Sequence, residues 1–142
     1  MTSKNIDALR ASFEVWNKRD LKKAASAYSE NAAVVNHGRE ITYKGRDQIV
    51  GSWDELVKGF PDAEVTDLNY YDAGDTIVTT FVGRGTNKGE MMGMPSTGRR
   101  VSTPICLVSH FDAKGLIDRE DQYSDSFSLL VQLGHAKAPV QA

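Results

Sequence analysis

Residues 115–125 of the chain read GLIDREDQYSD, and four of these side chains are acids. The stretch follows a turn-forming segment, residues 112–115, and comes shortly before an apolar segment, residues 129–134. Side chains alternate between the two faces of a strand, so a strand over 116–124 places acids on both faces. At least one acid is therefore expected to face the interior, which indicates a pocket with a polar group in its wall.

The segments before this stretch predict further strands. Residues 64–71 and 76–84 alternate between apolar and polar side chains around a turn at 72–75, as a hairpin does. Residues 85–100 contain four glycines and a proline, too many for a regular element, and predict a loop. Residues 101–111 are rich in apolar side chains and predict the strand that precedes 116–124.

The first half of the chain predicts mainly helices. Apolar residues at helical spacing indicate a helix over 4–18, with Ser3 as its N-cap. Asp20 caps a second, short helix whose inner stripe is Leu21, Ala24, Ala25 and Tyr28. A short β-branched strand at 32–36 and a helix from Gly45 to Phe60 follow, and Pro61 ends that helix. With a final helix over 126–133, this order predicts an α+β fold in which a curved antiparallel sheet wraps around helices and leaves an internal pocket.

Length and composition favour one globular domain. At 142 residues we expect a single domain over 1–134 and a loose tail over 135–142. The formal net charge is −2, so no basic face for nucleic acid is expected. The single cysteine and three scattered histidines show no metal-ligand spacing, so we predict no metal and no other cofactor. Residues 1–10 are polar and no window is apolar enough for a membrane span, so we expect a cytoplasmic protein.

Six short motifs follow one another along the chain: Tyr28–Ala32, Tyr43–Asp47, Phe60–Asp62, Gly85–Gly89, Gly93–Arg99 and Tyr123–Gly134. Taken in this order, they resemble those of the SnoaL-like polyketide cyclase family in the nuclear transport factor 2-like superfamily. The resemblance implies a cone-shaped fold with a deep apolar pocket for a small-molecule ligand. It also implies a homodimer joined through the outer face of the sheet.

The same resemblance bears on the catalytic residues. It places the family's catalytic carboxylate at Gln122, which turns Glu120 and Gln122 inward, whereas hydrophobicity alone slightly favours the face of Ile117 and Tyr123. Gln122 cannot act as a base but can hydrogen-bond a substrate oxygen. Glu120 is the remaining candidate base, with a structural acid paired to Arg119 or another cation as the alternative.

Other side chains are expected around the same pocket. Asn36 corresponds to a water-positioning asparagine of related hydrolases, although an asparagine that closes a turn is the alternative. By the same resemblance, Tyr28, Trp53 and Phe81 are expected near the cavity, and Met92 lies on a loop that could form a lid over an apolar ligand. We expect structural roles for His110 and for Asp125, the latter as a helix N-cap.

The function that these residues predict is proton transfer on an apolar, oxygenated small molecule, as in cofactor-independent polyketide cyclisation or isomerisation. A buried carboxylate base and a donor that stabilises the enolate are what such chemistry needs. A non-catalytic ligand-binding module and an epoxide-hydrolase-like enzyme are the alternatives.

Overall fold

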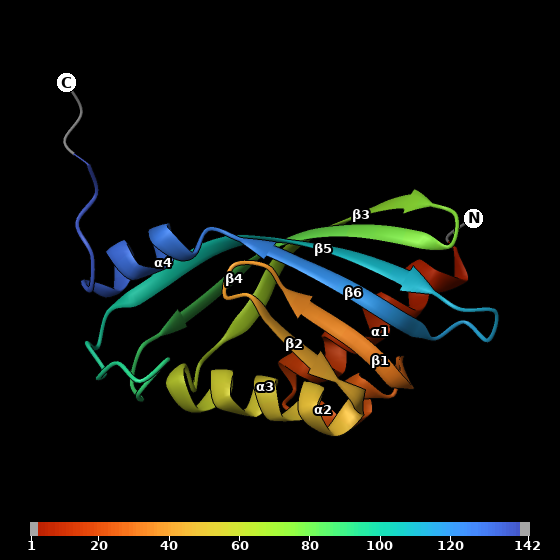
Figure 1. Ribbon diagram of the computed structural model, residues 1–142, viewed down its shortest axis with the longest axis horizontal. Helices are drawn as coiled ribbons and strands as arrows, with labels where there is room; N and C mark the ends of the chain where they lie inside the picture. Colours follow the sequence, from red (N-terminus) through yellow and green to blue (C-terminus); the bar gives the residue numbers. More distant parts are fainter. Residues whose placement is uncertain (1–2, 140–142) are drawn as a thin grey trace.

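The computed structural model describes residues 3–139, so part of the expected tail, residues 140–142, lies outside the described residues. Four helices and six strands make up this part of the chain (Figure 1). In chain order they are α1 (Lys4–Asn17), α2 (Leu21–Ala25), β1 (Tyr28–Asn36), β2 (Ile41–Lys44), α3 (Gly45–Gly59), β3 (Glu64–Ala73), β4 (Thr76–Thr86), β5 (Arg100–Phe111), β6 (Ile117–Ser124) and α4 (Ser126–Leu133).

The predicted helix caps are confirmed. The side chain of Ser3 accepts a hydrogen bond from the Ile6 amide at 3.0 Å, and Asp20 accepts one from the Lys23 amide at 3.2 Å. Asp125 caps α4 in the same way through the Ser128 amide, at 2.9 Å. Each cap satisfies a backbone donor that has no partner within its own helix, which fixes where the helix begins.

The sheet has the strand order β2-β1-β6-β5-β4-β3. β1 runs parallel to β6, whereas the other neighbouring strands run antiparallel. The four long strands β3 to β6 are antiparallel as predicted, and the prediction of an antiparallel sheet was wrong only for the pair β1 and β6. The pair is parallel because the chain crosses over from β1 through α3 and the meander of β3, β4 and β5 before β6 reaches the edge of β1. β6 then runs in the same direction as β1.

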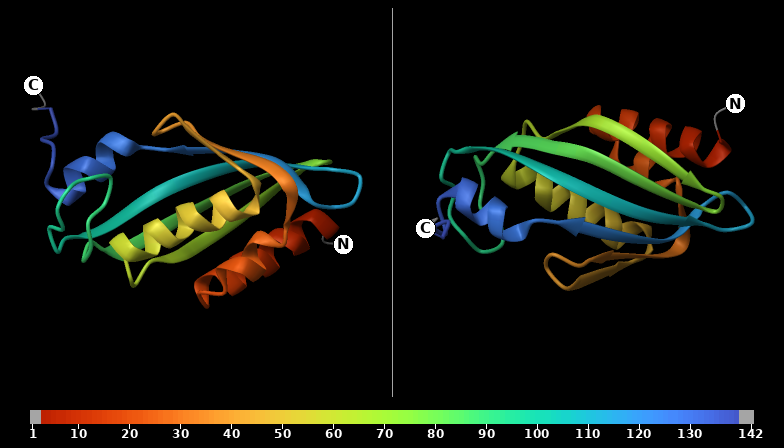
Figure 2. Two further views of the ribbon diagram at one scale, coloured as in Figure 1. Left: turned by 60° about the horizontal axis from the view of Figure 1, so that its bottom comes forward. Right: turned by 90° about the horizontal axis from the view of Figure 1, so that it is seen from above.

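Three helices, α1 to α3, cover one face of the curved sheet, and residues 3–139 leave the opposite face uncovered (Figure 1). Seen from above, the strands lie in front of α1 and α3 (Figure 2). Two clusters of buried side chains fill the space between the layers. One centres on Leu9, Ile49, Ile77, Phe111 and Ile117, and the other on Trp16, Phe60, Met91, Val101 and Leu133.

Two details of the first half of the chain differ from the sequence prediction. Tyr28 does not belong to the short helix, because α2 ends at Ala25 and Tyr28 is the first residue of β1. The strand expected at 32–36 thus begins four residues earlier. β2 was not predicted, because its four residues are too few to show a pattern.

A bulge at Asp118 changes which side chains of β6 face inward. His110 pairs with Arg119 and Phe111 pairs with Ile117, so Asp118 is left without an opposite residue. Ile117 and Glu120 therefore face the same way, with exposures of 0% and 1%. Strict alternation would have separated them, which is why hydrophobicity pointed to the wrong face.

Candidate functional site

A cavity of about 260 Å³ lies between the sheet and the helices. Its wall is mostly aliphatic and aromatic, with a few polar groups, as is usual for small-molecule sites. All seven side chains that the sequence singled out lie on this wall. They are Tyr28, Asn36, Trp53, Phe81, Met92, Glu120 and Gln122.

Glu120 is the buried acid of the cavity wall. Its two carboxyl oxygens each lie 2.9 Å from the Tyr28 hydroxyl, and Ser109 Oγ lies 2.8 Å from Oε2. Arg119, the neighbour considered as a partner, bonds to Asp121 at 2.9 Å instead. Within residues 3–139, Glu120 forms no ion pair with Lys, Arg or His, so neutral hydrogen-bond donors and not a cation hold this carboxyl.

The surroundings of Glu120 favour its neutral form. Burial raises the pKa of the Glu120 carboxyl, and hydrogen bonds from Ser109, Tyr28 and Gln122 offset part of that rise. Burial, followed by the nearby Glu120 charge, raises the pKa of the Tyr28 hydroxyl well above its ordinary value. Tyr28 therefore remains a hydrogen-bond donor, and Glu120 is the more acidic group of this pair, the one that can give up and take back a proton.

Gln122 and Asn36 lie side by side on the wall, since they pair across the parallel strands β6 and β1. Asn36 Oδ1 accepts a hydrogen bond from the Arg39 amide at 3.1 Å. This bond is the turn-closing role that was the alternative for Asn36. It leaves the NH₂ group of Asn36 as a possible donor to a ligand.

Aromatic rings shape the apolar part of the cavity. The Tyr28 and Trp53 rings meet edge to face with centroids 5.8 Å apart, and the Phe13 and Phe81 rings do so at 5.4 Å. Edge-to-face contacts hold rings in fixed orientations. The ring contact of Tyr28 and its hydrogen bond to Glu120 together fix the position of the acid relative to the aromatic wall.

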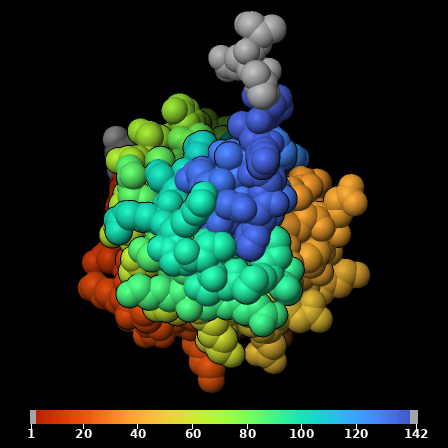
Figure 3. All heavy atoms as spheres, turned by 90° about the vertical axis from the view of Figure 1, so that its left-hand side faces the viewer, coloured from red at the N-terminus to blue at the C-terminus, as the bar shows by residue number. Residues whose placement is uncertain are grey.

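The loop between β4 and β5 closes one end of the molecule, where it lies with α4 (Figure 3). Asn87, only 1% exposed, holds this loop through bonds to the Gly89 carbonyl at 2.9 Å and from the Thr97 amide at 2.9 Å. Lys88 and Gly89 donate their amides to the Gly59 carbonyl at the end of α3. These bonds place Met91 and Met92 against the cavity.

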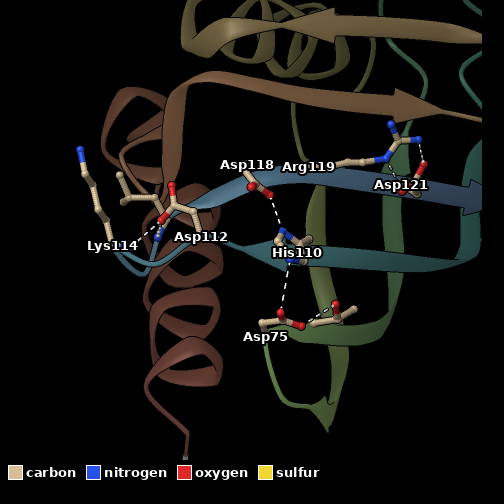
Figure 4. Close-up of polar contacts among 9 residues, drawn as sticks. Asp75, His110, Asp112, Lys114, Asp118, Arg119 and Asp121 are labelled. Atoms are coloured by element: carbon tan, nitrogen blue, oxygen red, sulfur yellow. Dashed lines mark hydrogen bonds and ion pairs between the residues drawn. The ribbon is translucent and has the colours of Figure 1, made fainter.

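The histidines lie away from the cavity. His110 joins β5 to β6 and to the β3–β4 turn, with Nδ1 2.6 Å from Asp118 and Nε2 3.5 Å from Asp75 (Figure 4). The hydrogen bond to Asp118 raises the pKa of His110. His37 bonds to Asp121 at 2.7 Å and stacks on Tyr123 with ring centroids 4.6 Å apart. Both side chains have structural partners, as expected for His110.

Sequence reasoning missed two residues of the site. Ser109 is fully buried and bonds to Glu120, and Arg39 lies on the cavity wall next to Asn36. The alternation of residues 101–111 would have turned Ser109 inward with Leu107 and Phe111. A buried serine between apolar neighbours was therefore the available signal.

Two negative findings hold for residues 3–139. No helix in this part of the chain is both long and apolar enough to span a bilayer. In the same residues, no group of three or more His, Cys, Asp or Glu side chains is arranged to hold a metal ion.

The curved sheet over three helices defines a nuclear transport factor 2-like fold, the fold class to which the structural neighbours belong. The chain belongs to the SnoaL-like polyketide cyclase family, whose model matches residues 6–133. No curated protein matches the sequence.

Solved structures with the same fold cover almost the whole chain. A candidate SnoaL-like polyketide cyclase from Jannaschia sp. CCS1 is similar over 96% of this chain and 98% of its own, with 19% identity and a TM-score of 0.84. The candidate polyketide cyclase IdmH from Streptomyces antibioticus is similar over 93% and 99%, with 26% identity and a TM-score of 0.79. A candidate hydroxylase, AclR from Streptomyces galilaeus, is similar over 97% and 85%, with 21% identity and a TM-score of 0.83.

Proposed function

We propose that the protein binds an apolar, oxygenated small molecule in its cavity and transfers protons on it without a cofactor. The reaction class is the cyclisation or isomerisation of a polyketide-like ketone. The observation that carries the proposal is Glu120, a buried carboxyl on the cavity wall with hydroxyl partners and no paired cation. Family membership is consistent with this class and does not specify the substrate.

In the proposed reaction, the carboxylate form of Glu120 takes a proton from the carbon next to the substrate carbonyl. The C–H electron pair moves into the enolate, and the proton binds a Glu120 oxygen. In an isomerisation Glu120 returns this proton to another carbon of the enolate, and in a cyclisation the enolate carbon attacks a second carbonyl of the substrate, whose oxygen takes the proton. Either route restores the carboxylate. Gln122 and Asn36, which lie side by side, donate their NH₂ groups to the developing oxyanion. Because its pKa is raised, the Glu120 carboxylate is a stronger base than a solvent-exposed one, which favours proton transfer from the substrate carbon.

The experiment uses β-tetralone, a bicyclic ketone with exchangeable protons next to its carbonyl. The protein is mixed with this ketone in deuterated buffer, and loss of the α-proton NMR signals is followed. We expect exchange above the buffer rate that saturates with ketone concentration. The Glu120→Gln variant, which keeps the size of the side chain, should bind β-tetralone and lose the accelerated exchange. Equal rates for the two proteins, both with bound ketone, would rule out Glu120 as the base.

A non-catalytic binding module is the second candidate. It is favoured by the hydrogen bonds to Glu120, since both carboxyl oxygens already contact Tyr28 and one contacts Ser109. In that case β-tetralone binds without any protein-dependent exchange. The epoxide-hydrolase-like alternative has less support, because Asn36 Oδ1 is already occupied by the Arg39 amide.

We also propose that the protein forms a homodimer through the uncovered face of the sheet. Support comes from neighbouring apolar side chains on that face, where Val78 pairs with Val108 and Cys106 pairs with Tyr123. Tyr123 is 47% exposed in the single chain. Sedimentation velocity should give a dimer for the wild-type protein and a monomer for Val108→Glu, and a monomeric wild type at high concentration would refute the interface.

A further inference from the structure

The β1–β2 turn lies beside the junction of β6 and α4 (Figures 1 and 2). Polar side chains of these segments line one end of the cavity. Ser126 Oγ donates to the Gly38 carbonyl at 3.0 Å. A Cβ atom on Gly38 would lie 3.3 Å from Ser124 Oγ and 3.4 Å from Asn36 Oδ1. These contacts bring the turn and the junction together around a cavity end that also includes Gln122 and Arg39.

Arg39 is the unpaired cation of this end. Its backbone amide bonds to Asn36, but within residues 3–139 its guanidinium has no hydrogen bond or ion pair. The other arginine on the cavity wall, Arg84, differs because it pairs with Asp67 at 3.0 Å and bonds to Thr66 and Ser102. A partly exposed guanidinium beside an apolar cavity is well suited to bind an anionic oxygen group, which it can hold with two parallel hydrogen bonds.

The positions along β6 set the distance between this end and Glu120. Glu120, Gln122 and Ser124 all lie on the cavity wall at alternate positions of the strand. At ~3.3 Å per residue, Ser124 lies roughly 13 Å further along the strand than Glu120. Gln122 lies midway, where it can donate to a carbonyl. The wall thus presents a proton-transfer group, an amide donor and a cation in that order.

We propose that Arg39 determines substrate specificity by binding a carboxylate at the end of the molecule opposite to the carbon on which Glu120 acts. The substrate class is then a keto acid with an apolar body between its carbonyl and its carboxylate. This inference rests on the proposed function for the position of the reacting carbon, but the binding of a carboxylate by Arg39 is measured separately.

The test compares two ketone probes that differ in one group. The first is β-tetralone with a carboxylate on its aromatic ring, and the second has a neutral carboxamide in place of the carboxylate. Binding is followed by quenching of tryptophan fluorescence, since Trp16 and Trp53 both line the cavity. The wild-type protein should bind the carboxylate about tenfold more tightly than the amide, a difference of ~1.4 kcal/mol.

Three variants show whether the preference comes from Arg39. Arg39→Gln should reduce the preference to about one, and Arg39→Lys should keep part of it because charge remains without the planar fork. Lys18→Gln is the control, since it removes one positive charge from an exposed pair with Glu14 on α1. This control should keep the full preference.

The outcomes separate this inference from the proposed function. Equal binding of the two probes by the wild type, an unchanged preference in Arg39→Gln, or no binding of either probe at millimolar concentration overturns the role of Arg39. A preference for the carboxylate probe that depends on Arg39 supports the role of Arg39, whatever the rate of α-proton exchange. If the wild type exchanges α-protons no faster than Glu120→Gln, that result refutes only the proposed reaction.

Discussion

The closed position of the β4–β5 loop depends on a glycine at position 89. The Gly89 and Lys88 amides donate to the Gly59 carbonyl at 3.2 and 3.0 Å, so the loop lies directly on the end of α3. A Cβ atom at Gly89 would overlap the Lys58 carbonyl oxygen and lie 3.0 Å from the Lys58 carbonyl carbon. These are backbone atoms, which cannot rotate away, so in Gly89→Ala the loop must move off the helix.

The cost of this movement follows from the contacts that are lost. Two backbone hydrogen bonds contribute about 1 kcal/mol each, and the strain of a forced contact adds about 1–2 kcal/mol. We therefore expect Gly89→Ala to lower the free energy of unfolding by about 3–4 kcal/mol, measured by urea denaturation. Gly51→Ala is the matched control, because an added Cβ at Gly51 in α3 has no atom within 4 Å. The control should gain about 0.5–1 kcal/mol from helix propensity. A Gly89→Ala protein as stable as the wild type would refute the described loop contact.

The remaining predictions concern buried polar groups. Burial raises the pKa of Glu120, so the native state holds this proton more tightly than the unfolded state, and stability should fall as pH rises from 4.5 through the folded-state pKa. Urea denaturation over this range should show a smaller decrease for Glu120→Gln, and an identical pH dependence would contradict the burial of an unpaired acid. Thr79 Oγ1 is buried without a hydrogen-bond partner among residues 3–139, so Thr79→Val should stabilise the protein by about 1 kcal/mol. Ser109→Ala, by contrast, removes a donor to Glu120 and should destabilise the protein by about 1–3 kcal/mol at alkaline pH, where Glu120 is charged. Equal effects of these two substitutions would show that the hydroxyl partners are misassigned.

Local signals in the sequence predicted most of the fold. The caps at Ser3, Asp20 and Asp125 are contacts within four residues, and helical or alternating periodicity also depends only on near neighbours. β2 and the start of β1 lacked such a signal. The residues of β1 before 32 include polar side chains, and the strand starts at Tyr28 because Tyr28 pairs with Ile117 of β6, before the irregularity that ends at Ala33. Pairing between distant segments overrides local preference there.

In the site, too, some features could be predicted from the sequence and others could not. The residues of the cavity wall could be chosen from the sequence with the help of the family resemblance, and all seven lie on it. The bulge at Asp118 could not be predicted from the sequence, because a bulge depends on how β5 and β6 pair in the sheet. The bond between Tyr28 and Glu120 joins residues 92 positions apart, so no local pattern shows it.

The central claim is that Glu120 is a buried carboxyl of elevated pKa on the wall of a ligand cavity. Titration of the Glu120 side-chain carboxyl by carbon-13 NMR tests this claim most directly, with the Glu120→Gln variant identifying the signal. We predict a midpoint clearly above the ordinary value of 4.5, and a further upward shift in Ser109→Ala, which lacks one donor to the carboxylate. A midpoint at or below 4.5 would contradict both the burial of this acid and its proposed part in proton transfer.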